Sequence, residues 1–309
     1  MIILKKLYFI FIIFIFLSSN IEATLLNFDI KPSNYKSTKQ KNIRILDSKE
    51  FVSDKKEIDE LSALAYDSKT LYALSDRGFL YHFDLEIADD KIKKMILKKE
   101  FELKSKKDKG LKKSERDSEG LVFYKGKLFI SFERKHRIGV FDLDGKNIKY
   151  KKIHKDLQNL DNFKSENKGL ESLVYSKKYG IITAPEKPLI ITNSKYHTLY
   201  AKNKTWKFKK TGSITALEMI DKDSIMILER EFSWFTFRRV TTISSLNLKK
   251  CKNGLCKSKI LAKLDTSKGW NLDNFEGLTK VGKNRYLMIS DNNGRFYQKT
   301  LLVLFEIID

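Results

Sequence analysis

The chain has 309 residues, of which 41% are hydrophobic and 12% aromatic, and its formal net charge is +22. This composition excludes a disordered chain. The positive charge could indicate nucleic-acid binding, but only 10 of the 61 basic residues are Arg, and Lys is scattered along the whole chain. Neither an aromatic stacking platform nor a groove-fitting helix accompanies the charge, so we attribute it to a Lys-rich composition and expect no specific nucleic-acid partner.

Residues 1–23 have the parts of a signal peptide: a basic start, an apolar run of about a dozen residues, and a passable cleavage site at Ile21-Glu22-Ala23. The run is short for a membrane span. We therefore predict a mature chain from about Thr24 that is exported to the periplasm or secreted; an uncleaved N-terminal anchor is the alternative. No later apolar run reaches spanning length, so residues 24–309 should form one domain that does not span a membrane.

Five segments downstream share one pattern: a polar residue, a small residue and Leu, then two short apolar runs around a polar turn, and an acid. The starting positions are Glu60, Glu119, Glu171, Thr215 and Glu276, and the closing acids are Asp76, Glu133, Glu186, Glu229 and Asp291. The apolar runs are rich in β-branched and aromatic residues and are separated by turn residues, which indicates strands.

About four strands per unit of roughly fifty residues is typical of a β-propeller. We predict an all-β propeller with five blades and leave six open, because residues 24–58 could add part of another blade. A β-sandwich is the alternative fold, but it does not explain acids at both ends of each hairpin. The C-terminal run LLVLFEI leaves the fifth unit one strand short. We expect a strand from residues 25–50 to complete it and so to remove two sheet edges.

Two cysteines, Cys251 and Cys256, flank Asn253-Gly254, a strong hairpin signal. A two-residue loop there pairs the two cysteines across the hairpin at a separation that suits a disulfide. A metal site is the alternative, but no third Cys or nearby His accompanies the two thiols.

The repeat also predicts where a site lies. The first strand of each propeller blade lines the channel, and the second returns to the same end, so starting and closing acids should converge on one channel mouth. Crowded carboxylates need a compensating cation or Arg. Arg77, Arg134 and Arg230 each follow a closing acid directly. They either pair with blade acids or bind a substrate anion.

The motifs resemble those of the phytase-like family, described as having esterase-like activity of phytase. They occur in order as SDRG at Ser75–Gly78, DSEGL at Asp117–Leu121, GLESL at Gly169–Leu173, LEREF at Leu228–Phe232, NFEGL at Asn274–Leu278 and SDNN at Ser290–Asn293. The resemblance implies an exported bacterial β-propeller and, by analogy with propeller phytases, calcium and phosphoester chemistry. Thr215 departs from the pattern, so the ring of glutamates is incomplete.

A serine-hydrolase nucleophile elbow and a zinc-ligand spacing are both missing from the sequence. Oxygen ligands are abundant, and Ca²⁺ accepts six to eight of them. The predicted ligands are Glu119, Glu171, Glu276, Asp76, Asp291 and Asn292. The alternative is that these acids only close the blades through backbone bonds and Arg pairs.

Two functions remain open. The first is a calcium-dependent, exported hydrolase, with a small phosphorylated or carboxylic ester as substrate. The second is a non-catalytic propeller that binds a ligand or an envelope partner through the same mouth. We expect a monomer in either case.

Overall fold

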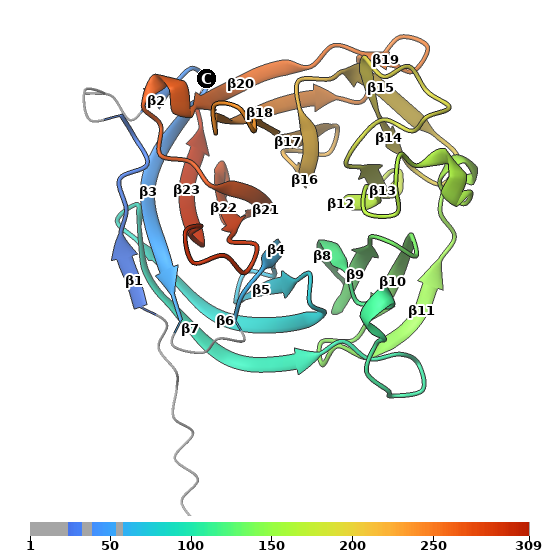
Figure 1. Ribbon diagram of the computed structural model, residues 1–309, viewed down its shortest axis with the longest axis horizontal. Coiled ribbons are helices and arrows are strands. Elements are labelled where there is room, and N and C mark those ends of the chain that lie inside the picture. The colour runs from blue at the N-terminus through green and yellow to red at the C-terminus, as the bar shows by residue number, and fades with distance from the viewer. Residues whose placement is uncertain (1–23, 33–38, 54–57, 309) are drawn as a thin grey trace, which may run out of the picture.

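The computed structural model describes residues 24–32, 39–53 and 58–308 as five sheets around a common centre (Figure 1), antiparallel except for one short parallel edge strand. The sheets follow one another around the ring in chain order, as in a five-bladed β-propeller. The predicted fold is confirmed, and the described residues form no sixth blade. The signal peptide predicted for residues 1–23 lies outside the described residues.

In the first four blades the strands run outward from the channel in chain order. Blade one contains β4 (Leu61–Tyr66), β5 (Thr70–Ser75), β6 (Phe79–Ala88) and β7 (Lys91–Glu102). Blade two contains β8 (Ser118–Tyr124), β9 (Lys127–Phe132), β10 (Arg137–Phe141) and β11 (Asn147–Lys151). Blade three contains β12 (Leu170–Ser176), β13 (Gly180–Pro185), β14 (Tyr196–Tyr200), β15 (Thr205–Lys209) and β19 (Leu255–Cys256). Blade four contains β16 (Ser213–Met219), β17 (Ser224–Phe232), β18 (Arg239–Asn247) and β20 (Lys259–Asp265).

Blade five joins the two ends of the chain. From the channel outward its strands are β21 (Asn274–Lys280), β22 (Arg285–Asp291), β23 (Leu301–Ile307), β3 (Ile43–Val52) and β1 (Thr24–Asn27), with β2 (Lys39–Gln40) also on β3. β3 pairs antiparallel with β23, from Ile307 opposite Ile43 to Leu301 opposite Glu50. The prediction that an N-terminal strand completes the last blade is therefore confirmed.

Helical structure in the described residues is limited to four 3₁₀ segments in the connections between strands. They are η1 (Lys113–Glu115), η2 (Lys155–Leu157), η3 (Leu160–Asn162) and η4 (Thr266–Lys268). Across residues 24–32, 39–53 and 58–308, no helix has the length and apolarity that a membrane crossing requires.

Each of the five inner strands carries a β-bulge near its start. The extra residues are Ser62, Glu119, Glu171, Thr215 and Glu276. A bulge re-aims a side chain and is common next to functional sites. The alignment of the five repeats in the sequence predicts that Glu60 is the first blade's counterpart of Glu119, and this prediction is wrong by two residues. Ser62 occupies the equivalent position, and Glu60 precedes the strand.

The small residue after each bulge faces the neighbouring blade. A Cβ on Gly120 would lie 2.9 Å from the backbone nitrogen of Leu173, and one on Gly277 would lie 3.2 Å from the Cα of Ala63. These contacts leave no room for a side chain, because neighbouring backbone cannot move aside easily. The Leu that follows is buried in every blade: Leu64, Leu121, Leu173, Leu217 and Leu278. In the repeated polar-small-Leu pattern, the polar residue is the bulge residue, the small residue packs against the neighbouring blade, and the Leu is buried in the core.

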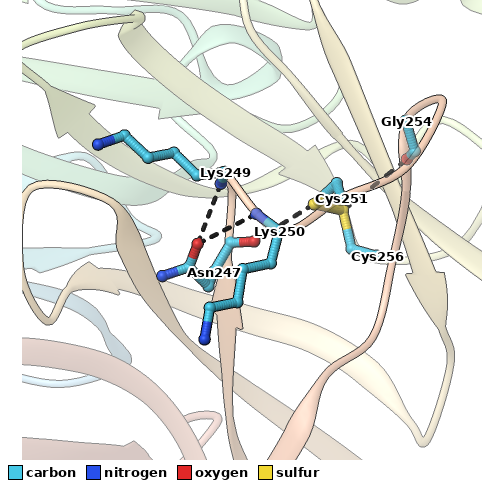
Figure 2. The surroundings of a disulfide bond; sticks show 6 residues. All are labelled: Asn247, Lys249, Lys250, Cys251, Gly254 and Cys256. Carbon is cyan, nitrogen blue, oxygen red and sulfur yellow. Dashed lines mark hydrogen bonds between the residues drawn. A yellow bond between two sulfur atoms is a disulfide. The ribbon is translucent and has the colours of Figure 1, made fainter.

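The two cysteines close a hairpin between β18 and β20 (Figure 2). Asn253 and Gly254 have φ values of 48° and 76°, as a two-residue hairpin turn requires. The sulfur atoms of Cys251 and Cys256 are 2.06 Å apart, in the predicted pairing. β19 lies parallel to β15, so this hairpin attaches a blade-four connection to the outer edge of blade three.

Candidate functional site

The central channel is narrow and is lined near one end by four of the bulge residues: Glu119, Glu171, Thr215 and Glu276. The two hydroxyl bulge residues hold adjacent blades together. Ser62 Oγ donates to the carbonyl of Ser118 at 2.7 Å, and Thr215 Oγ1 donates to the carbonyl of Phe275 at 3.0 Å. Blades one and four therefore use the bulge position for a seam between inner strands, whereas the other three place a carboxylate there.

Five carboxyl side chains form two overlapping groups at this mouth. Asp117, Glu119 and Glu133 form the first group, and Glu133, Glu171 and Glu186 form the second. In each group one oxygen from every residue lies within 4.8 Å of the others. Calcium–oxygen bonds of about 2.3–2.6 Å place ligand oxygens up to roughly 5 Å apart, so either group matches the spacing around one calcium ion. Glu133 belongs to both groups.

Three of these carboxyl groups are poorly compensated. Burial raises the pKa of Glu119 well above its ordinary value, and the charge of Glu171 adds to the shift. Burial, with the charge of Glu186, does the same to the pKa of Glu171. In the described part of the chain no hydrogen-bond donor contacts either carboxylate. Burial also raises the pKa of Glu133 to about 7, although the backbone nitrogen of Gly169 donates to Oε1 at 3.1 Å.

Three cations, Lys168, Lys187 and Arg230, lie against Glu186 and Glu276, and Lys187 Nζ is the most distant at 3.8 Å from Glu186. Lys168 Nζ is 2.6 Å from Glu186. Although burial acts to raise it, the pKa of Glu186 is lowered by the hydrogen bond from Lys168 and the charge of Arg230. Arg230 Nη1 lies 3.1 Å from Glu276 Oε1, yet burial still holds the pKa of Glu276 above its ordinary value. The positive charge at this mouth is therefore smaller than the negative charge that full ionisation would create.

Asp76 forms a separate carboxyl pair on the blade-one side of the mouth. Burial, followed by the charge of Glu60 and a hydrogen bond with it, raises the pKa of Asp76 to about 9. The Oδ1 atom of Asp76 is buried and has no hydrogen-bond partner among the described residues. Glu60 in turn lies 3.8 Å from Arg77.

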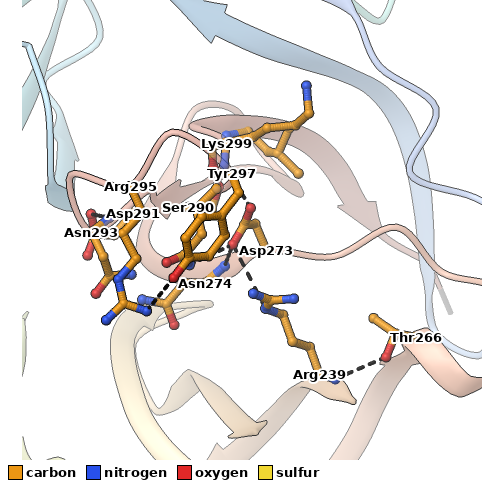
Figure 3. A network of polar contacts seen from close by, with 12 residues as sticks. Arg239, Thr266, Asp273, Asn274, Ser290, Asp291, Asn293, Arg295, Tyr297 and Lys299 are labelled. Carbon is orange, nitrogen blue, oxygen red and sulfur yellow. Dashed lines mark hydrogen bonds and ion pairs between the residues drawn. The ribbon is translucent and has the colours of Figure 1, made fainter. Parts of the chain in front are cut away.

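Asp291 and Asn292 extend the mouth along blade five (Figure 3 shows Asp291). Burial and the charge of Glu276 raise the pKa of Asp291 well above its ordinary value, against a 2.7 Å bond from the backbone nitrogen of Asn293. The amide oxygen of Asn292 accepts a hydrogen bond from the backbone nitrogen of Glu60 at 3.2 Å. That oxygen already has a protein donor, which the sequence did not predict.

The three predicted anion-binding arginines are in different surroundings. Arg230 is half-buried within the cluster, where the charges of Glu276 and Glu171 keep its pKa raised although burial opposes them. Arg134 donates from Nε to Asp117 at 2.6 Å. Arg134 and Arg77 are about half exposed and form ion pairs at the rim. The structure brings only Arg230 next to the channel glutamates.

Glu229 has a structural role: its carboxylate closes its blade through hydrogen bonds, as the alternative to a metal site predicts. Its carboxylate accepts hydrogen bonds from the backbone nitrogens of Thr211 and Gly212 at 2.9 and 3.0 Å, and from the Thr211 hydroxyl at 2.7 Å. With Thr215 at its bulge, blade four adds no carboxylate to either three-residue group.

The carboxylate groups overlap only in part with the six predicted ligands. Glu119 and Glu171 lie inside the groups, and Glu276, Asp76 and Asp291 lie around them. Glu133 and Glu186 were noted as closing acids but were not among the predicted ligands, and Asp117 was overlooked. Its signal was present, because Asp117 precedes the strand of the DSEGL motif and its carbonyl accepts the backbone nitrogen of Glu133.

Fold and site together define a five-bladed propeller with a carboxylate-lined channel mouth. The phytase-like family, described as esterase-like activity of phytase, matches residues 56–294. The chain belongs to this family, which confirms the resemblance seen in the motifs. No curated protein sequence matches the chain.

Solved structures resemble the chain only at low sequence identity and low TM-score. The PQQ-bound aldose sugar dehydrogenase from Streptomyces coelicolor is 9% identical with a TM-score of 0.48, over 89% of this chain and 100% of that one. YCF48 from Cyanidioschyzon merolae is 10% identical with a TM-score of 0.39, over 93% and 96% of the two chains. The Dos1 propeller is 8% identical with a TM-score of 0.36, over 84% and 73%. We infer no activity from similarity at this level.

Proposed function

We propose that the protein is an exported, calcium-dependent hydrolase of phosphate or carboxylic esters that acts at the carboxylate-lined mouth. The observation that carries the proposal is the position of Glu133, which shares close oxygen spacing with two carboxyl groups on each side. Membership of a family described by esterase-like activity supports the reaction class. Export rests on the sequence of residues 1–23.

The donor set fits a hard divalent cation. Glu119, Glu133 and Glu171 offer carboxylate oxygens that no cationic side chain neutralises at short range in the described residues, whereas Asp117 and Glu186 already pair with Arg134 and Lys168. Calcium prefers such oxygen ligands. When bound, it would polarise an ester oxygen and activate a water.

The remaining chemistry falls to this chain's own side chains. Glu133 belongs to both carboxylate groups and would be the ligand that holds the cation from either side. Arg230 stands at the edge of the cluster and presents a planar guanidinium that can hold a phosphate or carboxylate. Exclusion of bulk water from the narrow channel strengthens both interactions.

Hydrolysis of p-nitrophenyl phosphate and p-nitrophenyl acetate, measured with calcium and with a chelator, tests the proposal. Calcium should support turnover of one ester and the chelator should abolish it. Glu133→Gln should lower kcat/KM by roughly 100-fold, because it removes the carboxylate that both groups share and so weakens binding of the cation. Glu86→Gln, at an exposed residue of β6, is the matched control and should have no effect.

If the rate of ester hydrolysis changes neither with the chelator nor with Glu133→Gln, the protein is not a calcium-dependent hydrolase. Absence of turnover on both ester types would favour the non-catalytic, ligand-binding alternative. Export has its own test: protein recovered outside the cytoplasm should begin near Thr24, and recovery with residue 1 retained would contradict a cleaved signal.

A further inference from the structure

A pocket of about 180 Å³ lies between blades four and five, beside the carboxylate-lined mouth. Its lining includes Arg230, Arg239, Arg295, Phe232, Trp234 and Asn274. Two of these residues contact the mouth directly, because Arg230 Nη1 and Asn274 Nδ2 lie 3.1 and 2.8 Å from Glu276 Oε1. A ligand in this pocket would therefore lie next to the channel glutamates.

Arg239 has only a weak anionic partner (Figure 3). Its Nε atom is 3.9 Å from Asp273 Oδ1. That carboxylate is already engaged, because it accepts hydrogen bonds from Gln298 Nε2 at 3.0 Å and from the backbone nitrogen of Lys299 at 2.7 Å. By contrast, Arg238 next along the chain holds Asp265 at 2.5 Å. The guanidinium of Arg239 thus keeps donors available for an anion.

Arg295 comes from the connection between β22 and β23 and also lines the pocket. Its Nη1 atom donates to the Tyr297 hydroxyl at 3.0 Å, and none of the described carboxylates pairs with it. The other acid that lines the pocket, Glu231, lies 3.4 Å from Lys263. Two arginines from different blades therefore line one small pocket, and of the described carboxylates only Asp273 pairs with either of them, at 3.9 Å from Arg239. This arrangement leaves guanidinium donors for bidentate recognition of phosphate or carboxylate.

The pocket also has an aromatic wall. Trp234 is 72% exposed, and its ring meets that of Phe232 edge to face, with centroids 4.9 Å apart. The guanidinium carbon of Arg239 lies 5.4 Å from the Phe232 centroid. An exposed indole beside two available guanidinium groups offers a flat apolar surface to whatever the arginines hold.

We propose that this pocket binds a small anion that carries an aromatic ring, namely an aryl phosphate or aryl carboxylate. The arginines Arg239 and Arg295 hold the anionic group, and the ring lies against Trp234. The volume is well below the roughly 300–1,000 Å³ of pockets for drug-sized ligands, so it takes one ring and its anion. The claim that this ligand is also the substrate rests on the proposed function. The claim that the pocket binds it does not depend on that function.

Trp234 supplies a built-in reporter of the ligand. The chain has three tryptophans, and the other two, Trp206 and Trp270, are 0% and 3% exposed. Titration of the full mature chain with phenyl phosphate and with benzoate, in a chelator and without calcium, should quench the exposed tryptophan in a saturable way. Phenyl phosphate should bind roughly tenfold tighter than inorganic phosphate, because the ring adds an aromatic contact.

The arginine variants separate specific binding from general attraction to a basic protein. Arg239→Gln and Arg295→Gln should each weaken binding of the preferred ligand, measured by calorimetry, roughly tenfold or more. Arg285→Gln, whose parent residue pairs with Asp90 elsewhere on the surface, is the matched control and should bind like the wild type. Trp234→Leu should reduce the preference for phenyl phosphate over inorganic phosphate.

Failure to bind either aryl anion overturns the proposal, as does equal weakening by all three arginine variants. A response to anionic lipid vesicles but to neither aryl anion also overturns it, and assigns the loop that carries Trp234, between β17 and β18, to contact with a membrane surface. Since all titrations are made without calcium, a lack of hydrolysis leaves this result unaffected. Conversely, calcium-dependent hydrolysis without aryl-anion binding would contradict this inference but would still support the proposed function.

Discussion

A chain that starts at Phe51 should lose cooperative unfolding, whereas a chain that starts at Phe28 should keep it. The longer truncation removes most of β3, including the residues from Ile43 to Glu50 that pair with the whole of β23. It also removes Ile43 and Ile45, which are buried in the core between blades four and five. Burying two such side chains contributes about 3–6 kcal/mol, comparable with the total stability of many domains.

The shorter truncation is the matched control. It removes only β1, whose side chains are largely exposed and which pairs only with β3. Urea unfolding followed by near-ultraviolet circular dichroism distinguishes the two chains. A single steep transition for the chain that starts at Phe51, with the midpoint of the full mature chain, would show that the ring closes without its N-terminal strand.

Arg230→Met should destabilise the calcium-free protein by about 3 kcal/mol at pH 8. The substitution preserves apolar bulk but leaves Glu276 beside Glu171 and Asp291 without their shared cation. Removing one partner of a largely buried ion pair typically costs about 3–5 kcal/mol, and Arg230 is partly exposed, so we expect the lower end. Calcium should reverse much of the loss, because it supplies positive charge to the same cluster.

The effect of pH has a defined sign. Burial raises the folded-state pKa of Glu276 and Asp291 above the values in the unfolded chain, so these groups favour folding at low pH and lose that contribution as pH rises through the folded pKa. The calcium-free wild type should therefore be more stable at pH 5 than at pH 8. The variant should show a steeper fall, because without Arg230 the carboxylates are harder to ionise.

Chemical denaturation at the two pH values measures both differences. Arg285→Met is the control, since its exposed pair with Asp90 should contribute less than about 1 kcal/mol at either pH. If Arg230→Met and Arg285→Met cost the same at pH 8, the carboxylates at the mouth do not depend on Arg230 for their charge balance.

The sequence predicted the propeller because each blade repeats a hairpin whose positions have fixed roles. It also predicted the closing strand, since LLVLFEI needed a partner across the sheet. The bulge was not predictable from spacing alone. It places Ser62 rather than Glu60 in the first blade, and a one-residue shift in a strand changes which side chain faces the channel.

The carboxylate groups and the pocket depend on contacts between blades, which a single repeat cannot specify. Glu133 was visible as a closing acid, but its closeness to Glu171 arises only when two blades pack together. Arg239 and Trp234 lie at the start of β18 and in the loop before it, outside the repeated motif. They line the same pocket as Arg295 because of loop conformation, for which the sequence offered no periodic signal.

Thermal unfolding of the chelated protein across a calcium titration tests most directly whether the carboxylate cluster binds calcium. A ligand that binds only the folded state at about 100 times its Kd stabilises by about 2.7 kcal/mol, so Tm should rise by several degrees. Glu133→Gln should abolish most of the rise, Glu171→Gln should reduce it, and Glu86→Gln should leave it unchanged. A Tm that moves with neither calcium nor chelator, in the wild type and in every variant, would contradict the account and assign these carboxylates to blade structure alone.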